Sequence, residues 1–415
     1  MVKMNMRRLR KTIRKIKILV VMSMLFIAVI GCKGEKTASQ SSENIAEEET
    51  LLEKENTGNL CSRKTELLKK NLSVFENAEK VFLGELGENV RLVGFTDTKI
   101  YGVRNETDKG NGVTDTVYLA FNRKNPEEAI ELYRGNFSYI LLEEVLEDTL
   151  YVMNAQMTEN MDNPWLITLY MLGQNGKEEI VYSTRTLTIP QVWHNSTSFF
   201  VCAESKDSSL VSYIDVINPA KEADRVSTIV YNGFQRDQEG RITGEFILYG
   251  GGDDHYIYYQ NKIMEEEVLD ENRDVSVVEY DLKENLSGDV LYLKNGLSRH
   301  ISGNPEYILM VQYVDDIQEI NQQNNTVIFI NKNSLDLWEL PETPVGFEVY
   351  LTLWLDDNQV VLQNYKSAFL VDLEEKSYVC WDEPGYKISI YDGQYIGGIN
   401  EKTNEFYCID ISQID

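Results

Sequence analysis

Short runs of apolar and aromatic residues recur from residue 79 to the C-terminus, and a cluster of turn-forming residues follows each run. The first four runs, at 92–95, 99–103, 116–121 and 129–133, are rich in Val, Ile, Tyr and Phe. Asn, Asp, Gly and Pro punctuate the segments between them, and no long amphipathic helical pattern intervenes. Runs of this length and composition predict β-strands, so we expect four consecutive strands here.

This set of four strands recurs along the chain. Five further sets of four runs follow, at 138–182, 191–231, 246–293, 299–339 and 350–381. A four-stranded unit repeated about every 40–50 residues is typical of the blades of a β-propeller. We therefore predict an all-β fold, a β-propeller domain that occupies residues 79–415.

The last unit predicts how the ring closes. It contains three runs, at 386–391, 395–398 and 406–411, before the chain ends, whereas the apolar run at 80–83 precedes the first full set. Closing a ring removes open sheet edges, which otherwise invite aggregation. The pattern predicts seven four-stranded blades, with the last blade completed by the N-terminal strand. Six blades, or an array of β-sandwiches, are the alternatives.

The N-terminus differs sharply from the rest of the chain. Its first 17 residues carry eight Lys and Arg and no acidic residue, and an apolar run follows at 18–30. A run of about 13 residues suits the central region of a signal peptide. It is short for a membrane span, which needs about 20 residues. An uncleaved signal anchor is the alternative.

The sequence Val29-Ile30-Gly31-Cys32 resembles the lipobox of bacterial lipoprotein signal peptides. With the repeated strands, it makes the chain similar to bacterial cell-surface lipoproteins that carry a β-propeller. The resemblance implies a signal peptide at 1–31, cleavage before Cys32, and lipid attached to that cysteine. Two acyl chains suffice for stable anchoring. We therefore expect an extracytoplasmic protein that is anchored to the bacterial cell membrane.

Residues 32–62 predict a flexible acidic tether. This stretch is rich in Ser, Glu, Asn and Thr, contains Glu47-Glu48-Glu49, and has no aromatic residue. Such a composition buries too little apolar surface to offset the entropy of ordering the chain. In the following segment, 63–78, apolar residues lie near helical spacing, which predicts a short helix that leads into the propeller.

The charge of the chain limits its partners. It has 67 Asp and Glu residues against 40 Lys and Arg, and eight of the basic residues lie in the predicted signal peptide. The mature part therefore carries 32 basic residues and a net charge of −35. A surface this acidic repels nucleic acid, so we expect no nucleic-acid partner. Solubility explains the charge, and a surface that binds cationic ligands is the alternative.

Four cysteines remain after Cys32: Cys61, Cys202, Cys380 and Cys408. No Cys-x-x-Cys pair is present, so zinc-ribbon and thioredoxin-like sites are not expected. Cys202 lies in the apolar run 199–203, which predicts a buried strand. We favour buried, unpaired thiols, and a disulfide between Cys380 and Cys408 is the alternative.

One segment suggests a binding site: Gly250-Gly251-Gly252-Asp253-Asp254-His255. Three glycines allow close backbone approach, and two carboxylates and an imidazole follow at once. We predict Asp253, Asp254 and His255 as ligand-binding residues, unless the segment is a turn within a blade. Calcium is a possible ligand there or at the loop 105–115, although it prefers six to eight oxygens. We expect no other metal or cofactor.

Motifs for catalysis are not evident in the sequence. It has no Gly-x-Ser-x-Gly elbow, no Gly-rich phosphate loop, and three histidines in three separate units: His194, His255 and His300. With so many acidic residues, a pair of carboxylates has little specificity as a signal. We predict a non-enzymatic propeller that binds an extracellular ligand or an envelope protein. The alternative is an extracellular carbohydrate-active or peptide-cleaving enzyme that uses Asp or Glu.

Overall fold

The computed structural model describes residues 78–413 with short gaps, at 108–113, 174–176, 207–209, 222, 234, 237–241, 265–274, 294–297, 315–323, 335, 341–350, 364–367, 382–385, 392–393 and 401. The predicted signal peptide, Cys32, the tether and the helix at 63–77 lie outside the described residues. Within the described part, no helix has the length and apolar character needed to cross a membrane.

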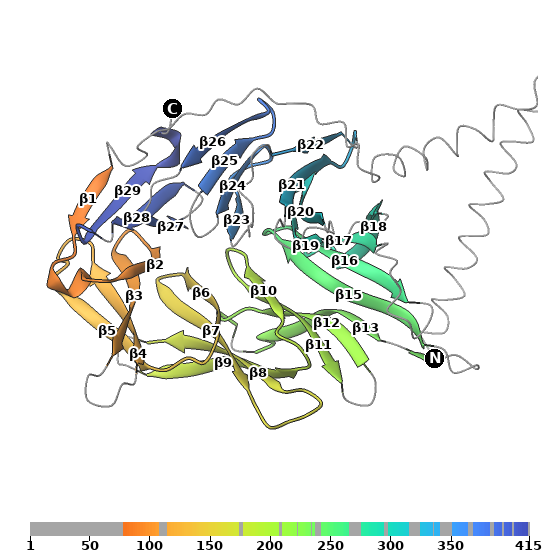
Figure 1. The fold of residues 1–415 in the computed structure, drawn as a ribbon, viewed down its shortest axis with the longest axis horizontal. Coiled ribbons are helices and arrows are strands. Elements are labelled where there is room, and N and C mark those ends of the chain that lie inside the picture. The colour runs from red at the N-terminus through yellow and green to blue at the C-terminus, as the bar shows by residue number, and fades with distance from the viewer. Residues whose placement is uncertain are drawn as a thin grey trace, which may run out of the picture. The chain divides into compact units, whose positions relative to one another are not determined.

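Seven antiparallel sheets make up the described part of the chain (Figure 1). The strands of the first three sheets are β2 (Arg91–Phe95), β3 (Lys99–Thr107), β4 (Thr114–Asn122) and β5 (Ala129–Gly135); β6 (Ile140–Leu146), β7 (Thr149–Met157), β8 (Trp165–Leu172) and β9 (Glu178–Thr186); and β10 (Gln191–His194), β11 (Phe199–Lys206), β12 (Leu210–Ile217) and β13 (Val226–Gly233).

The fourth sheet has one strand more than predicted, because the short β14 pairs with the start of its first strand. The strands of this and the next two sheets are β14 (Gln235–Arg236), β15 (Ile242–Gly252), β16 (Tyr256–Met264), β17 (Val275–Asp281) and β18 (Leu286–Leu293); β19 (Ser298–Gly303), β20 (Tyr307–Val314), β21 (Asn324–Asn331) and β22 (Leu337–Glu339); and β23 (Leu351–Trp354), β24 (Gln359–Gln363), β25 (Ala368–Asp372) and β26 (Ser377–Trp381).

The seventh sheet joins the two ends of the domain. It has the order β1-β29-β28-β27, built from β1 (Glu79–Phe82), β27 (Tyr386–Tyr391), β28 (Tyr395–Asn400) and β29 (Glu405–Asp410). Two 3₁₀ turns, η1 (Glu85–Gly87) and η2 (Ile411–Gln413), follow β1 and β29.

The strand β1 closes the ring. It pairs antiparallel with β29, so that Val81 lies opposite Phe406, and the backbone N–H of Leu83 donates to the carbonyl of Asn404 at 2.9 Å. The structure confirms the prediction of a seven-bladed β-propeller whose last blade is completed by an N-terminal strand. The alternative fold, a sandwich array, is not formed.

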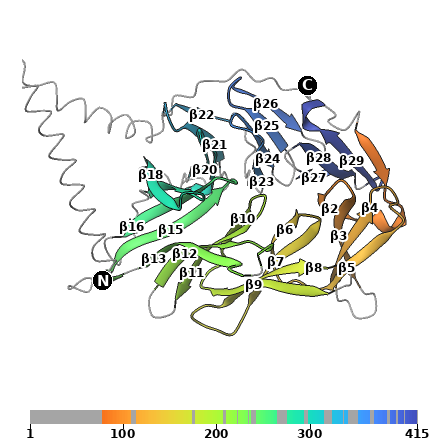
Figure 2. The ribbon, with the colours of Figure 1, turned by 180° about the vertical axis from the view of Figure 1, so that it is seen from behind.

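The sheets are arranged as blades around a centre (Figures 1 and 2). The first strand of each blade is innermost, and the first strands of successive blades, from β27 through β2, β6, β10 and β15 to β19, lie side by side. The fourth strand of each blade is at the rim. Each described blade interface therefore brings together strands from two sequence units.

The core of the propeller lies between the blades. Side chains alternate along a strand, so each blade contributes one set to each of its neighbours. In β11, Phe199 and Val201 pack against the second blade, whereas Phe200 and Cys202 pack against the fourth. Burial on both faces explains why these strands are continuous apolar runs in the sequence.

Two faces of the ring differ in their connections. We call the side that carries the turns between the first and second strands, and between the third and fourth, the turn face. The opposite side, which we call the loop face, carries the loops between second and third strands and the connections between blades. On the turn face, the N–H of Leu282 donates to the carbonyl of His255, which ties the two turns of one blade together.

Turns on the turn face repeat one device. Four of the turns between first and second strands begin with a residue whose side-chain oxygen accepts the backbone N–H groups two and three positions further on, at 2.6–3.0 Å: Asn195, Asp253, Asn304 and Asp356. Asn and Asp favour such turns because their short side chains imitate a backbone carbonyl. The device ends the first strand of a blade and starts the second.

Two cysteines of the described part, Cys202 and Cys408, are unpaired. Cys202 and Cys408 are both buried free thiols, and burial raises the pKa of Cys202 to about 12. The alternative disulfide between Cys380 and Cys408 is therefore not formed. Cys61 lies outside the described residues.

Candidate functional site

Asp253, one of the predicted ligand-binding residues, forms a turn. It follows β15, and its Oδ1 accepts the backbone N–H groups of His255 and Tyr256, both at 2.7 Å. Burial raises the pKa of its carboxyl, and the two backbone hydrogen bonds oppose that shift. Asn195 and Asn304 occupy the same place in the neighbouring blades, so the contacts of Asp253 are those of a repeated turn.

Asp254 and His255 lie beside it on the turn face. Asp254 Oδ1 accepts the backbone N–H of Ser196 at 2.8 Å, which joins the fourth blade to the third. Both side chains are exposed. The structure thus places the three predicted residues in one turn, and two of them have contacts that shape the turn and join blades.

The three glycines before Asp253 belong to β15 rather than to a turn. Gly250 to Gly252 pair with Tyr259 to Ile257 of β16. A Cβ atom at Gly251 would lie 1.8 Å from the carbonyl oxygen of Ile301 in β19. The close approach of the fourth and fifth blades therefore requires glycine at this position.

Metal ligands are not grouped in the described residues. No cluster of three or more His, Cys, Asp or Glu side chains suited to a metal ion occurs among them. The middle of the second predicted calcium loop, 108–113, lies outside the described part. A calcium site in this loop stays a prediction.

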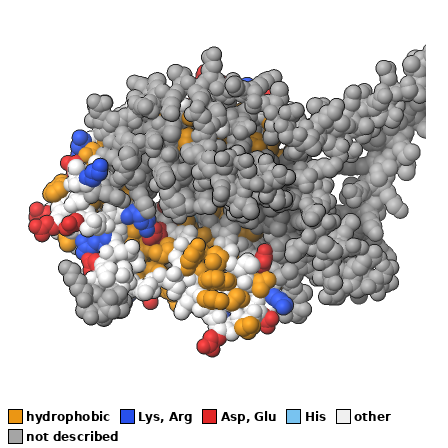
Figure 3. Space-filling view, viewed as in Figure 1, with side chains coloured by type: hydrophobic (Ala, Val, Ile, Leu, Met, Phe, Trp, Pro, Cys, Tyr) orange, Lys and Arg blue, Asp and Glu red, His pale blue; other side chains and the backbone are white. Residues whose placement is uncertain are grey.

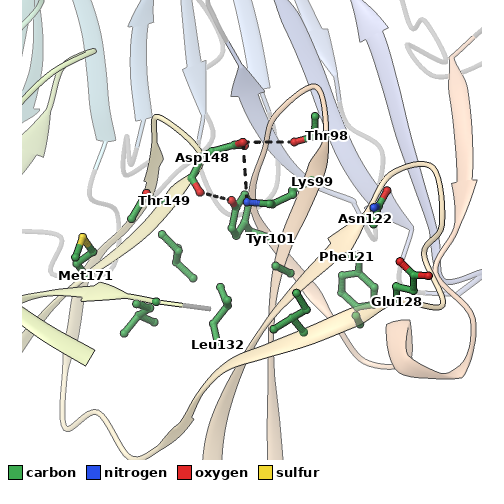
Figure 4. Close-up of a pocket in the computed structure, with 16 residues that line it drawn as sticks. Thr98, Lys99, Tyr101, Phe121, Asn122, Glu128, Leu132, Asp148, Thr149 and Met171 are labelled. Carbon is green, nitrogen blue, oxygen red and sulfur yellow. Dashed lines mark hydrogen bonds and ion pairs between the residues drawn. The ribbon is translucent and has the colours of Figure 1, made fainter. Parts of the chain in front are cut away.

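A pocket of about 570 Å³ opens on the turn face between the first and second blades (Figure 4). We call it the turn-face pocket. Its walls include Phe121, Leu132, Leu150 and Leu172, all of which are at most 3% exposed. Leu132, Leu150 and Leu172 belong to the apolar cluster between these two blades. The pocket is thus the open end of an inter-blade core.

Polar groups at the mouth of the turn-face pocket converge on Asp148. Thr96 Oγ1 donates to Asp148 Oδ1 at 2.5 Å, and Lys99 Nζ lies 3.9 Å from Oδ2. The hydroxyl of Tyr101 donates to the Asp148 carbonyl at 2.6 Å, as Figure 4 shows. Burial and, second, the charge of Asp148 raise the pKa of Tyr101. The mouth therefore presents an ammonium and a carboxylate above an apolar floor.

A tight turn positions Asp148. Glu147 and Asp148 connect β6 to β7 and both have positive φ, 46° and 62°. Two successive left-handed residues form a two-residue hairpin turn that matches the twist of the strands. Asp and Asn adopt this conformation more readily than bulkier residues. The turn and the bonds from Thr96 and Tyr101 fix the carboxylate at the pocket mouth.

Ionisable pairs lie on the innermost strands. Arg91 of β2 pairs with Glu143 of β6, which also accepts the hydroxyl of Tyr118 at 2.7 Å. The next residue, Glu144, points to the other neighbour, and its Oε2 lies 3.0 Å from His194 Nε2. Burial alone would lower the pKa of His194, but the charge and hydrogen bond of Glu144 outweigh it and raise that pKa.

Sequence reasoning missed the turn-face pocket and the Glu144–His194 pair. The pocket has no local signature, because its walls come from two blades. For the pair there was a signal: the innermost strand Ile140–Leu146 carries two adjacent glutamates in an otherwise apolar run. Adjacent residues of a strand point to opposite faces, so each glutamate must find a partner in a different blade.

Several solved structures are similar to this chain, and they belong to diverse proteins. TolB from Acinetobacter baumannii is 7% identical, with 74% of this chain and 80% of that chain covered and a TM-score of 0.35. The β-propeller domain of the Trilobed protease from Pyrococcus furiosus is 10% identical (75% and 91% covered, TM-score 0.43). Polysaccharide lyase Uly1 is 9% identical (79% and 91% covered, TM-score 0.43). At these identities the similarity concerns the fold alone.

No protein-family model and no curated protein matches the sequence. The class that the structure defines is a seven-bladed β-propeller closed by its first strand. What the propeller does must be argued from its own sites.

Proposed function

We propose that this chain is a membrane-anchored extracytoplasmic lipoprotein whose propeller binds a ligand or protein partner and does not transform it. The turn-face pocket is the observation that carries the binding part. An apolar, largely preformed pocket with a few convergent polar groups is the usual form of a ligand site. The lipid anchor is supported by the lipobox at Val29–Cys32 and by the basic and apolar segments that precede it.

The pocket favours a ligand with an apolar group and a charged end. Ile130 and Met171, which line the pocket and are partly exposed, would contact the apolar group, and Lys99 lies at the mouth beside Asp148. A hydrophobic peptide side chain or a small amphiphile has this chemistry. The Asp148 carboxylate already accepts a short bond from Thr96, which supports a structural role for it at the mouth.

A fluorescent amphiphile tests the pocket. Anilinonaphthalene sulfonate combines an apolar ring system with one anionic group, and it should bind the full-length protein in detergent with a fluorescence increase over detergent alone. Ile130→Glu places a charge at the pocket mouth and should weaken binding by about tenfold, since apolar contact there is lost. The matched control is Ile180→Glu, on the rim of the second blade and 58% exposed. Equal binding by both variants would contradict the assignment.

The Glu144–His194 pair favours the enzymatic alternative, a carbohydrate-active or peptide-cleaving enzyme. A histidine held by a carboxylate can act as a general base. Peptides and cell-wall glycans incubated with the protein should be recovered intact under our proposal. Cleavage by the wild-type protein that is lost in Glu144→Gln, and kept in Asp254→Asn, would establish the alternative instead.

The lipid anchor is tested separately. Cys32→Ser should abolish incorporation of labelled fatty acid and leave the protein unprocessed or released from membranes. Mass spectrometry of the N-terminus reads out the cleavage. Unchanged membrane retention together with a processed N-terminus would contradict lipidation.

A further inference from the structure

A second pocket, of about 670 Å³, lies on the loop face between the second and third blades. We call it the loop-face pocket. It is lined by the β7–β8 loop and by parts of strands β8, β9, β11, β12 and β13. It shares no lining residue with the turn-face pocket and opens on the opposite side of the ring.

Polar side chains dominate the walls of the loop-face pocket. They carry hydroxyl, amide, carboxylate and guanidinium groups: Asn160, Asn163, Ser183, Thr184, Arg185, Ser205, Asp215 and Thr228. Hydroxyl groups both donate and accept hydrogen bonds, whereas a carboxylate only accepts and a guanidinium only donates. A ligand that fits such a wall must offer many donors and acceptors, as a saccharide does.

Asp215 is a fixed acceptor in this pocket. It is 7% exposed, and its two oxygens accept the hydroxyl of Tyr182 at 2.7 Å and that of Thr228 at 2.5 Å. A β-bulge between Ile214 and Asp215 interrupts the pairing of β12 with β13 at this point. Each carboxylate oxygen has a second lone pair, so Asp215 can still accept a ligand hydroxyl.

Arg185 is the basic residue among those that line the pocket. Five other arginines in the described part pair with carboxylates: Arg91, Arg104, Arg123, Arg134 and Arg225. Arg185 is exposed, and its Nη1 donates to Thr158 Oγ1 at 2.8 Å, but no carboxylate of the described residues forms an ion pair with it. In a chain with a large excess of acidic residues, this leaves a guanidinium able to bind an external carboxylate.

An exposed aromatic ring completes the wall. Tyr231 lines the pocket and is 66% exposed, whereas Tyr213 beside it is buried and its hydroxyl lies 3.2 Å from Thr184 Oγ1. A flat exposed ring offers apolar contact to the C–H face of a sugar while its hydroxyl stays in water. A solvent-facing Tyr gains little stability for the fold, so its place at this pocket suits a ligand contact.

The β7–β8 loop that forms one wall is tightly held. The N–H of Thr158 donates to the carbonyl of Pro164 at 2.7 Å, and Asn160 Oδ1 accepts two backbone N–H groups at 3.0 Å. Asn163 is buried, and it exchanges hydrogen bonds with the backbone of Lys206 in the third blade at 2.8 and 3.2 Å. A wall fixed in this way loses little entropy when a ligand binds.

We propose that the loop-face pocket is a binding subsite for a carboxylate-bearing sugar, with Arg185 on the carboxylate, Asp215 and its neighbours on ring hydroxyls, and Tyr231 against the ring face. The site is independent of the turn-face pocket. It gives the protein a second ligand, an acidic saccharide. Excess negative charge elsewhere on the chain opposes long polyanions, so the site suits a terminal or isolated uronic acid unit.

Two matched probes test the site. The full-length protein in detergent is titrated by calorimetry with an oligosaccharide that ends in a uronic acid and with the same oligosaccharide after reduction of its carboxyl group. The acidic probe should bind more tightly by about tenfold or more, because a charge-assisted bidentate contact to Arg185 is lost in the neutral probe.

Variants assign the contacts. Arg185→Ala should remove the difference between the two probes, and Tyr231→Ala should weaken both. Arg134→Ala, whose arginine pairs with Glu106 and Glu131, is the matched control and should change neither. Ile130→Glu at the turn-face pocket should also leave both affinities unchanged, which separates this inference from the proposed function.

Three outcomes would overturn the inference. They are no binding of the acidic probe to the wild-type protein, equal binding of the acidic and neutral probes, and an acidic preference that persists in Arg185→Ala. Circular dichroism of each variant establishes that the fold is kept. Arg185→Lys provides a second variant, which keeps the positive charge but loses the bidentate geometry of the guanidinium.

Discussion

The turn-face pocket and the loop-face pocket both lie at an interface of the second blade, yet their chemistry is opposite. The first is floored by Leu132, Leu150 and Leu172, members of an inter-blade core. The second is walled by hydroxyls, amides, the carboxylate of Asp215 and the guanidinium of Arg185. Both are formed by the same propeller repeat, so the repeat alone does not decide what a pocket can bind.

The difference follows from the connections on the two faces. On the turn face the connections are tight turns, which cover little, and the end of the apolar core stays open. On the loop face the longer β7–β8 loop brings Asn160 and Asn163 over the interface and buries Asn163 against Lys206. Surface loops such as the β7–β8 loop often carry function.

Apolar side chains gather on the surface of the second blade (Figure 3). At the end of β7 and in the β7–β8 loop of this blade, Met157 and Met161 are 69% and 92% exposed.

The largest expected effect is at the floor of the turn-face pocket. Leu150 is fully buried, and Leu150→Ala should lower the free energy of unfolding by about 2–5 kcal/mol, because buried methyl groups are lost and a cavity remains. Urea unfolding measures the change. Met157→Ala, at an exposed position of the same strand β7, should change stability by less than about 0.5 kcal/mol. A small effect of Leu150→Ala would show that the pocket floor is not part of the core.

Asp215 should have the next largest effect. Asp215→Ala leaves the buried hydroxyl of Tyr182 without its acceptor and should cost about 1–3 kcal/mol in urea unfolding. Uronate binding at the loop-face pocket should fall, whereas dye binding at the turn-face pocket should not. Tyr182→Phe removes the donor itself, and Asp215 keeps its hydrogen bond from Thr228, so this variant should cost less. Loss of both ligands would mean that the two pockets are not independent.

Two histidines on the innermost strands, His194 and His300, should give the stability opposite dependences on pH. Burial lowers the pKa of His300 to about 4, so the unfolded chain binds its proton more readily and stability should fall as pH drops from about 6.5 toward 4. The pKa of His194 is raised in the fold by Glu144, so its contribution is present below about pH 6.5 and is lost as pH rises through the folded pKa.

Unfolding titrations of His194→Gln and His300→Gln separate the two histidines. His300→Gln should reduce the loss of stability between about pH 6.5 and pH 4. His194→Gln should reduce the loss of stability above about pH 6.5. Because neither histidine lines the turn-face pocket or the loop-face pocket, both ligands should bind each variant as they bind the wild-type protein. If His300→Gln loses stability at acidic pH as the wild-type protein does, His300 is not the cause of that loss.

The smallest effect is expected at the mouth of the turn-face pocket. The side chain of Asp148 is 48% exposed and its contact with Lys99 is long, so Lys99→Met should change stability by less than about 1 kcal/mol. Binding of the anionic dye should nevertheless weaken and lose part of its salt dependence, since an ammonium is removed. Lys402→Met, an exposed lysine of the seventh blade, is the control. Dye binding that is insensitive to Lys99 would place the anionic group elsewhere.

Much of the fold could be predicted from the sequence, because its determinants are local. Each strand is a short apolar run, and the runs recur with turn residues at a steady period. The run at 80–83 was left over at one end and a strand was missing at the other, which predicted the pairing of β1 with β29. The candidate sites were not predictable in this way. Glu144 and His194, or Tyr182 and Asp215, meet across blades and share no local pattern.

The sequence by itself determined the repeated four-stranded unit and the strand that closes the ring, and it left six blades as an alternative to the seven that the structure forms. The tertiary structure alone decided that Asp253 starts a turn, that Gly251 accommodates a neighbouring blade, and that Arg185 lines a polar pocket without a carboxylate partner among the described residues. The physical reason is the distance along the sequence over which each kind of interaction acts. Strand and turn preferences act between residues a few positions apart, whereas the contents of a pocket depend on which faces of separate blades the ring brings together.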